Sequence, residues 1–224
     1  MNSSIYFSNV SIDYNQNSIV KDLNLDIQEG SWIEIIGSNN VGKSSLLNTL
    51  YGLSHNLTGG LKILGYDLNP LTGNIQELRR KIGFFSDALP LIENKTFRAN
   101  LSLALTSSNN IFDLESDAFL NSILDKLHLK HKLLEVIENF SSSDKTLSKL
   151  VRLLSIKPKL LLLDCPFRTL DKINSELVVE LLKKYHTSEK ATIIITSDAI
   201  TTNGPDGRMI YLMENQSLKH INKL

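Results

Sequence analysis

The sequence predicts an α/β protein whose parallel sheet is covered by helices on both faces. Strand-like apolar runs alternate with helix-like segments along the chain, which is the order of a parallel sheet with helical crossovers. Residues 160–163 are four consecutive leucines, typical of a strand buried on both faces. A glycine-containing segment at 37–44 lies between a strand-like and a helix-like run, where a phosphate-binding loop is expected.

The N-terminal part is expected to be mainly β structure. Glu29-Gly30 marks a turn, and residues 32–36 read as a buried strand that ends at a glycine. Residues 44–51 follow as a helix, because leucines recur at helical spacing and Gly52 supplies a stop. The earlier β-like runs are residues 5–7, 10–14, 19–20 and 23–27.

The middle of the chain is expected to be mostly helical, from about residue 75 to residue 140, with a polar loop at 106–110. One helical face there is apolar and consists of Phe119, Leu120, Ile123, Leu124 and Leu127. Beyond it the pattern predicts a helix at 147–154, a strand at 160–163, a helix at 174–185 and a strand at 192–195.

Composition excludes several classes of protein. The 224 residues contain 24 Lys and Arg against 24 Asp and Glu, so the chain lacks the positive excess of a dedicated nucleic-acid binder. With 42% hydrophobic residues it is too apolar to be disordered, yet no run approaches a membrane span. The N-terminus lacks the features of a signal peptide, and the single cysteine suits a reducing cytosol. We therefore expect a cytoplasmic globular protein.

Residues 37–44 read Gly-Ser-Asn-Asn-Val-Gly-Lys-Ser and fit the phosphate-loop pattern G-x-x-x-x-G-K-[ST]. In such a loop, backbone N–H groups and a helix N-terminus cradle phosphate oxygens, and the lysine adds a positive charge. The Ser44 hydroxyl is then placed to ligate Mg²⁺. The residues expected to bind the nucleotide here are Gly37, Ser38, Asn39, Asn40, Val41, Gly42, Lys43, Ser44 and Ser45.

An acidic residue at the end of a buried strand is expected to complete the site. Asp164 follows the four leucines directly, so it is predicted to hold the Mg²⁺ shell together with Ser44. The pairing of a phosphate loop with this aspartate predicts a nucleotide-binding protein of the P-loop NTPase class, with ATP and Mg²⁺ as ligands.

In the order of these motifs the chain resembles the nucleotide-binding subunit of ABC transporters over nearly its whole length. The resemblance implies a RecA-like core with an antiparallel β subdomain and an inserted helical lobe. The chain would be one ATP-binding domain, 1–224, with its core at 1–87 and 146–224 and its lobe at 88–145. It also implies that Tyr14 stacks on adenine, and that Asp171 and a serine-led signature at Ser141 lie at a dimer contact.

Within this family the chain looks most like the cell-division branch called FtsE, to which lipoprotein-release ATPases are closely related. The similarity rests on residues 77–83, Thr96 and Asn100. It implies a homodimer, peripheral on the inner face of the cell membrane, that pairs with an FtsX-like integral membrane subunit and not with nucleic acid. In this family a short helix of the membrane subunit binds in a groove of the ATP-binding subunit. Here the residues expected to form that groove are Phe84, Phe85, Leu89, Leu91, Ile92, Phe97 and Leu101.

The catalytic positions of the family are replaced. Asp87 stands where the loop glutamine is expected, Cys165 where the general base is expected, and Ser197 where the switch histidine is expected. In the signature, serines take the place of two glycines and put Cβ atoms where a partner's γ-phosphate would approach. The signature reads Phe140, Ser141, Ser142, Ser143 and Asp144.

These replacements predict that nucleotide binding is kept while hydrolysis is weak or lost. A neutral thiol at Cys165 lacks the two acceptor oxygens with which a carboxylate orients water. Two alternatives stay open. The first is an active ATPase for lipoprotein or small-solute export. The second is an ABC protein of translation or DNA repair, although 224 residues leave no room for its two cassettes or long coiled coil.

Several other residues are given two interpretations. Cys165 is either a small residue that fills the glutamate's space or a nucleophile, and no histidine is near it in sequence. His128 and His131 are either a solvated helix end or a metal pair. Residues 79–81 are a basic run, either a solvated face or a patch near phosphate, and no arginine stands out as a phosphate-binding finger.

Overall fold

The computed structural model describes residues 2–14, 17–53, 56–68, 75–107, 117–200 and 204–221. Its helices are α1 (Lys43–Leu50), α2 (Ile75–Lys81), α3 (Phe97–Ser107), α4 (Ala118–Lys126), α5 (Ser142–Ser155) and α6 (Lys172–Glu189), with 3₁₀ turns at Lys130–Lys132 and Ile137–Asn139. Its strands are β1 (Ser3–Tyr14), β2 (Asn17–Gln28), β3 (Trp32–Ile36), β4 (Leu57–Ile63), β5 (Tyr66–Asp67), β6 (Ile82–Phe85), β7 (Leu160–Asp164), β8 (Thr192–Ser197), β9 (Met209–Glu214) and β10 (Ser217–Ile221).

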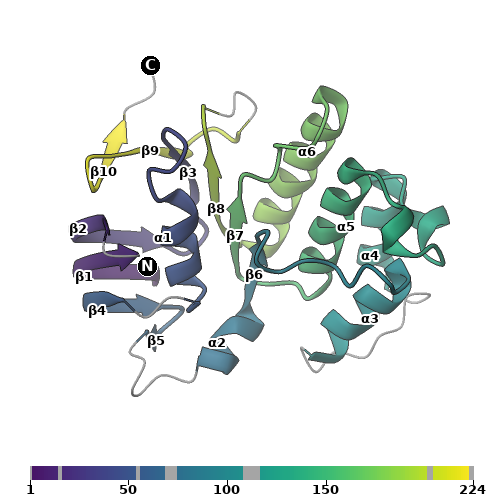
Figure 1. Cartoon of the computed structure of the whole chain (residues 1–224), viewed down its shortest axis with the longest axis horizontal. Coiled ribbons are helices and arrows are strands. Elements are labelled where there is room, and N and C mark those ends of the chain that lie inside the picture. Colours follow the sequence, from purple (N-terminus) through teal and green to yellow (C-terminus); the bar gives the residue numbers. More distant parts are fainter. Residues whose placement is uncertain are drawn as a thin grey trace.

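Two sheets organise the described residues (Figure 1). The six-stranded sheet has the order β10-β9-β3-β8-β7-β6, and the four-stranded sheet has the order β2-β1-β4-β5. In the larger sheet the strands from β9 to β6 pair in parallel, whereas β10 pairs with β9 antiparallel. The smaller sheet is antiparallel throughout. The predicted α/β class with an antiparallel β subdomain is therefore confirmed.

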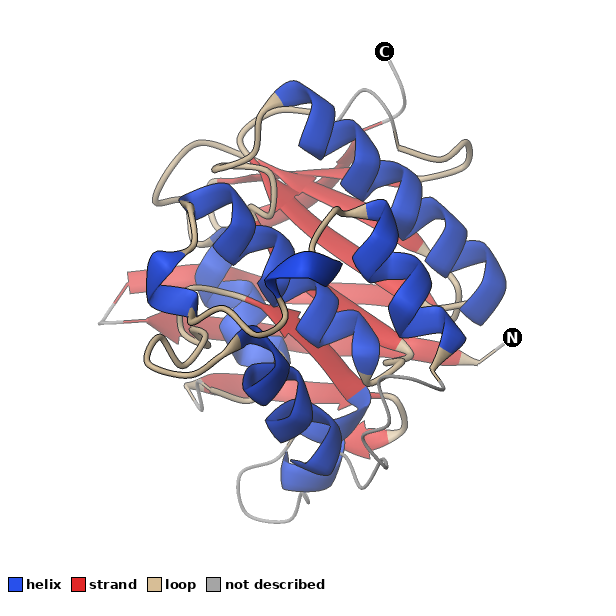
Figure 2. Cartoon of the chain, turned by 90° about the vertical axis from the view of Figure 1, so that its right-hand side faces the viewer, coloured by secondary structure: helices blue, strands red, loops and turns tan. Residues whose placement is uncertain are grey.

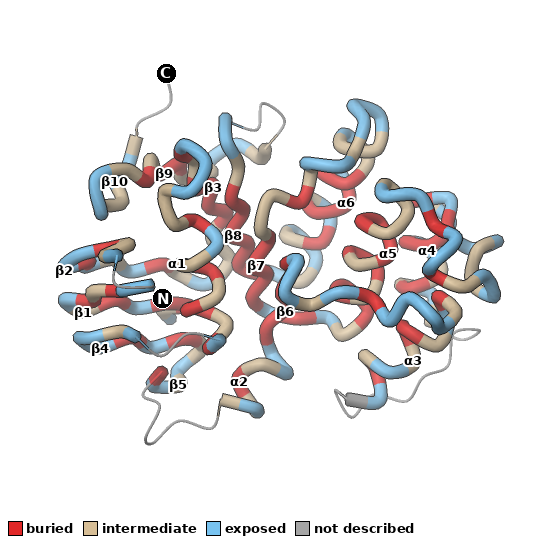
Figure 3. The backbone as a smooth tube through the Cα atoms, in the orientation of Figure 1, coloured by how far each residue is buried: buried red, intermediate tan, exposed pale blue. Residues whose placement is uncertain are grey.

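The larger sheet is apolar on both faces because each face covers a different core. In β7, Leu161 and Leu163 pack among the helices α3 to α6, whereas Leu160 and Leu162 face α1 and the smaller sheet. Ile193 and Ile194 divide between the two cores in the same way in β8. The helices that cover one face are seen in front of the strands in Figure 2, and Figure 3 shows how burial concentrates along the central strands.

Two features of the strands were not predicted from the sequence. Helices account for much of the described part of residues 75–140, as expected, but strand β6 follows α2 without a break and pairs with β7. This strand has only four residues, all buried, so its sequence lacks the alternation that would distinguish it from helix. The separate short runs near the N-terminus join into β1 and β2, whose ladder continues through several register shifts. These shifts break the period-two pattern that the sequence would otherwise carry.

The helices run longer than expected at their N-terminal ends, where polar caps extend them. Side chains of Asp117, Ser141 and Asp171 accept backbone hydrogen bonds at the starts of α4, α5 and α6. Of the loop expected at 106–110, Thr106 and Ser107 belong to α3, and 108–110 lie outside the described residues. Within the described ranges no helix is long and apolar enough to cross a membrane.

Candidate functional site

The phosphate loop connects the C-terminal end of β3 to the first turn of α1, the edge of a parallel sheet at which α/β proteins bind ligands. Its turn needs unusual backbone angles, with φ of 64° at Asn40 and 109° at Gly42. Asparagine tolerates the left-handed region better than most residues. At Gly37 a Cβ atom would lie 2.6 Å from the backbone oxygen of Met213, so only glycine fits beside β9.

The N-terminus of α1 differs from those of the other long helices. Its capping position is Gly42, which supplies no side-chain hydrogen bond, and its first turn contains no acidic residue. The starts of α4, α5 and α6 are instead each closed by a side-chain cap. Amide groups at the α1 terminus therefore have no side-chain acceptor at the cap, and the helix dipole favours an anion there.

The Lys43 side chain is held inside the phosphate loop by hydrogen bonds to the loop backbone. Its Nζ atom donates to the backbone oxygens of Gly37, at 2.6 Å, and Ser38, at 3.0 Å. It also lies 3.1 Å from Oδ1 of Asp198, which follows β8, and only 6% of the Lys43 side chain is exposed. Three oxygen acceptors thus hold the ammonium group at the inner end of the loop.

The opposite wall of the site is the end of β7. The Thr196 hydroxyl donates to Oδ1 of Asp164 at 2.8 Å, and the Cys165 N–H lies 3.1 Å from the same hydroxyl. The Cys165 sulfur lies 3.7 Å from that hydroxyl, and its backbone has a left-handed φ of 47°. β8 and β7 are neighbours in the sheet, so this cluster sits beside the phosphate loop that follows β3.

A pocket of about 550 Å³ opens between the loop, the end of β7 and the β1–β2 hairpin. Tyr14 lies on the hairpin side, 47% exposed. Cys165 lies on the β7 side, within the same lining. The lining consists of Tyr14, Asn17, Ser18, Ile19, Asn39, Asn40, Val41, Gly42, Lys43, Ser44, Ser45, Cys165 and Arg168. The structure thus brings most of the predicted nucleotide-binding residues into one cavity.

Two residues at replaced catalytic positions do not line this pocket. The Asp87 side chain is 91% exposed and its Oδ1 lies 3.3 Å from Nζ of Lys149 on α5. Ser197 donates its hydroxyl to the backbone oxygen of Ala199, within its own turn. Neither side chain is directed at the phosphate loop.

The signature segment forms the start of α5, and the side chains of Ser141 and Asp144 within it are hydrogen-bonded to each other. Ser141 caps the helix and donates to Oδ2 of Asp144 at 2.8 Å, while Nζ of Lys132 lies 2.6 Å from the same oxygen. Burial raises the pKa of Asp144, but the hydrogen bonds from Lys132 and Ser141 outweigh it and hold that pKa below its ordinary value. The carboxylate therefore stays charged at the helix start, where a partner's phosphate would have to approach.

Sequence reasoning missed four residues of this pocket, of which Arg168 is the charged one; the others are Asn17, Ser18 and Ile19. Arg168 lies in the turn after β7, its side chain is exposed, and it lines the pocket together with Lys43. The Cys165 side chain, followed by the carboxylates of Asp164 and Asp198, raises the pKa of Arg168 above its ordinary value. The only sequence signal was its position three residues after Cys165.

The donor atoms at the pocket suit a hard cation. Ser44 lines the pocket and offers a hydroxyl at the start of α1. Asp164 is not part of the lining, but its carboxylate ends β7 directly before the lining residue Cys165, and oxygen ligands are what Mg²⁺ prefers. His128 and His131 border a separate open hollow beside α4. Among the described residues no group of three or more His, Cys, Asp or Glu is placed to hold a metal.

A two-sheet fold with a phosphate loop after β3 and an acidic residue after β7 defines a P-loop NTPase. The family model described as "ABC transporter" matches residues 20–168. The chain belongs to the ABC transporter family, and its span corresponds to the family's ATP-binding subunit.

Known proteins similar to this chain include both importers and exporters by name. It is 28% identical over 198 residues to the ergothioneine transport ATP-binding protein EgtV of Helicobacter pylori, covering 88% of this chain and 91% of that protein. It is 32% identical to the methionine import ATP-binding protein MetN 1 of Acinetobacter baylyi, covering 79% of this chain and 49% of that protein. It is 28% identical to the macrolide export protein MacB of Campylobacter jejuni, covering 87% of this chain and 30% of that protein.

The fold is that of solved ATP-binding cassettes. The cassette MJ0796, solved as a dimer bound to ADP and Pi, superimposes with a TM-score of 0.84 at 24% identity, covering 96% of each chain. The ATP-binding subunit of an ABC transporter superimposes with a TM-score of 0.85 at 22% identity, covering 97% of this chain and 88% of that one.

Proposed function

We propose that this chain is the ATP-binding subunit of a membrane-associated, FtsE-like complex, and that it binds ATP with Mg²⁺ but hydrolyses it slowly or not at all. One observation carries the proposal. Tyr14 and residues 39–45 of the phosphate loop line one pocket, although Gly37, Ser38 and Asp164 do not. Cys165, by contrast, stands at the edge of this pocket, and neither Asp87 nor Ser197 lines it.

Different residues of the site bind the phosphates, the Mg²⁺ ion and the adenine ring. Amide groups of the phosphate loop and the open start of α1 receive the phosphate oxygens, with Lys43 between them. Ser44 and Asp164 hold Mg²⁺, which when bound offsets phosphate charge. Tyr14, half exposed at the edge of the pocket, offers a ring on which adenine stacks.

The domain division and the dimer contact are assigned as in the ABC transporter family. Residues 1–87 and 146–224 act as the core and 88–145 as a helical lobe. Two copies pair through Asp171 and the signature residues Ser141, Ser142 and Ser143. Residues that suggested the relation to FtsE have local structural roles here. The Asn100 side chain, for example, bonds the backbone N–H and oxygen of Ile92 and the oxygen of Thr96.

An active export ATPase is the second candidate, favoured by the similarity to the macrolide exporter. The Asp198 carboxylate beside Lys43 is 55% exposed, so it is a group that could orient water in the absence of the usual base. Measured turnover separates this candidate from the proposal.

Binding is tested first. Titration calorimetry of Mg²⁺-ATP into the purified chain is expected to give saturable binding, and Lys43→Ala is expected to weaken it roughly 10- to 100-fold, since a hydrogen bond to a charged group contributes ~1.5–3 kcal/mol. Lys62→Ala removes an equal charge from an exposed pair with Asp67 and should leave affinity unchanged. Wild-type protein that takes up no ATP would contradict the proposal.

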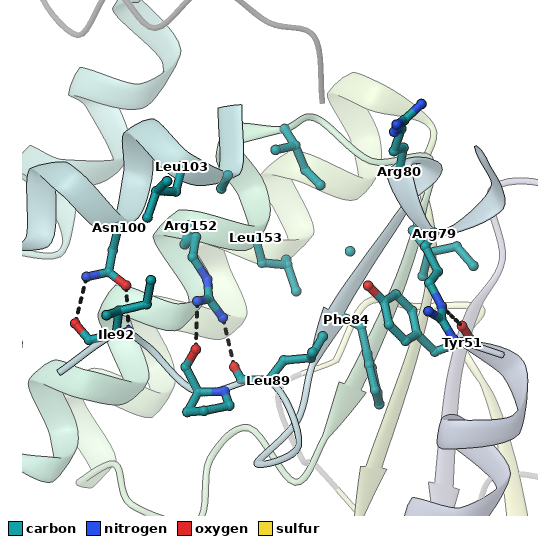
Figure 4. Close-up of a pocket in the computed structure, with 15 residues that line it drawn as sticks. Tyr51, Arg79, Arg80, Phe84, Leu89, Ile92, Asn100, Leu103, Arg152 and Leu153 are labelled. Carbon is teal, nitrogen blue, oxygen red and sulfur yellow. Dashed lines mark hydrogen bonds between the residues drawn. The ribbon is translucent and has the colours of Figure 1, made fainter. Parts of the chain in front are cut away.

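A second cavity supports the membrane partner. A groove of about 420 Å³ runs between α2 and β6 on one side and α3 and α5 on the other (Figure 4). Its walls are held by side chains bonded to backbone oxygens. Arg152 donates to Leu89 at 2.8 Å and Pro90 at 2.9 Å, and Arg79 donates to Gly52 at 2.6 Å. A groove held in this way is preformed for a ligand.

The anchors of this groove differ from those expected. Leu91, Phe97 and Leu101 are buried in the core of the helical lobe, so they do not offer a docking surface. The exposed apolar lining consists of Ile92, which was expected, and Leu103, which was not, and they are 45% and 49% exposed. With Arg79, Arg80 and Arg152 also in the lining, we propose a short helix of the membrane subunit that carries apolar anchors and an acidic residue.

Negative charge introduced into the lining tests this docking. The double variant Ile92→Asp and Leu103→Asp removes two apolar anchors and repels the acidic residue of the partner helix, and should weaken association with membrane fractions roughly 30-fold, as loss of a ~2 kcal/mol anchor would. Leu134→Asp is the matched control, because Leu134 is 75% exposed and lies outside the groove. If the double variant folds by circular dichroism yet stays on membranes, docking occurs elsewhere.

A further inference from the structure

Arg168 is fixed by the turn that follows β7. Its own N–H donates to the backbone oxygen of Cys165 at 3.2 Å, and Leu170 N–H donates to Phe167 at 3.1 Å. One residue further on, Thr169 shares a 2.6 Å hydrogen bond with Thr146 of α5. The backbone of this turn is therefore anchored on both sides of Arg168, while its long side chain reaches the pocket.

The pocket has an unusual charge balance. Of the described residues that line it, the charged ones are Lys43 and Arg168, and both are positive. The position at which the family carries a catalytic glutamate is Cys165, which has no carboxylate. Two carboxylates lie nearby, because Asp198 pairs with Lys43 and Asp164, which accepts from Thr196, keeps its negative charge. The charges of these groups therefore balance, and Arg168 is the exposed cation in the pocket lining that can meet an anionic ligand.

Arg168 is better placed than Lys43 to respond to such a ligand. Lys43 is placed to contact phosphate from within the loop, but it is 6% exposed and its ammonium group already faces three oxygen acceptors, one of them the Asp198 carboxylate. Arg168 is exposed on the opposite wall. A guanidinium group presents a planar fork of donors that matches two phosphate oxygens at once.

We propose that Arg168 binds the terminal phosphate of the nucleotide and thereby lets this pocket hold a nucleoside triphosphate with little dependence on a divalent cation. The inference rests on the proposed ATP binding and adds a residue and a property to it. Arg168 acts here as a binding residue, since it supplies no base for hydrolysis.

The test compares ATP affinity with Mg²⁺ and with EDTA in the full chain. Wild-type protein is expected to lose less than about tenfold in affinity when the metal is removed, whereas Arg168→Ala should lose about a hundredfold, because a charge-assisted contact then has no substitute. Arg168→Lys should recover part of the loss. Arg98→Ala removes an arginine from the start of α3, outside the pocket lining, and should behave as wild type.

A comparison of nucleotides locates the contact. Arg168→Ala should weaken ATP more than ADP in EDTA, because ADP lacks the terminal phosphate. Equal losses of ATP affinity in Arg168→Ala and Arg98→Ala would overturn the inference, as would wild-type binding that disappears in EDTA. If ATP fails to bind even with Mg²⁺, the proposed function itself is wrong and the inference falls with it.

Discussion

Magnesium-ATP added to the purified chain is expected to be hydrolysed at well under ~1 s⁻¹, the lower end of ordinary enzyme turnover. Loss of a general base alone lowers a rate by about 10²–10⁴-fold. The structure adds that the residues at the other two replaced positions are turned away. Asp87 pairs with Lys149, and Ser197 bonds its own backbone turn. A steady-state phosphate-release assay measures the rate.

The contaminant control is Lys43→Ala, which should abolish any activity that belongs to this site. Turnover of ~1 s⁻¹ or more that this variant removes would contradict the expectation. Asp198 would then be the first group to examine, because its carboxylate already lies 3.1 Å from Lys43 Nζ.

Reverting substitutions separate the causes of slow hydrolysis. Cys165→Glu alone is expected to restore little, because the new carboxylate would stand beside the Arg168 guanidinium and pair with it. It would also lack the histidine and the glycine signature with which it acts as a unit. The variant with Asp87→Gln, Ser142→Gly, Cys165→Glu and Ser197→His should exceed it clearly. If Cys165→Glu alone gave most of the hydrolysis rate of the four-residue variant, the replacements at the other three positions would matter little.

The phosphate loop and its surroundings could be predicted because their chemistry is local in sequence. Residues 37–44 contain a fixed order of glycine, lysine and serine, and Asp164 ends an unmistakable buried strand. Arg168 could not be identified in this way, since its importance depends on β7 and β3 lying one strand apart in the sheet. A contact between elements more than a hundred residues apart leaves no local pattern.

The docking groove shows a similar limit for apolar residues. Composition alone treats Leu91, Phe97, Ile92 and Leu103 alike, because each is a large apolar side chain in a helical region. Their burial depends on which side α5 packs, and that packing leaves Ile92 and Leu103 half exposed while it covers the other two. Strand β6 was missed for a related reason, since four buried residues fit helix and strand equally.

A buried ion pair stabilises the strand that carries the phosphate loop. Glu34 of β3 is fully buried, and its Oε1 lies 3.1 Å from Nε of Arg208, whose side chain is 7% exposed. The two atoms are close without hydrogen-bond alignment, so the contact between them is mainly electrostatic. A Cβ atom at Gly204 would lie 2.7 Å from Glu34 Oε1, so glycine is what lets the chain pass over the pair.

Arg208→Met is expected to lower the free energy of unfolding by about 3–5 kcal/mol, because it removes the guanidinium that lies beside the buried Glu34 carboxylate. For a chain of this size that corresponds to a fall of roughly 10 °C in Tm. Urea unfolding followed by circular dichroism measures it. Lys219→Ala, which breaks the exposed pair with Glu214, should cost less than ~1 kcal/mol.

The double variant Glu34→Leu with Arg208→Met distinguishes a charge effect from a loss of packing. Replacing both charges by apolar groups removes the buried carboxylate together with the guanidinium, so the double variant should be more stable than Arg208→Met alone. Because Arg208 precedes β9, whose Met213 packs against Gly37 and Gly42, the single variant should also weaken ATP binding. If Arg208→Met unfolds no earlier than Lys219→Ala, the pair does not support the phosphate loop, and the positioning of β3 must come from its apolar neighbours alone.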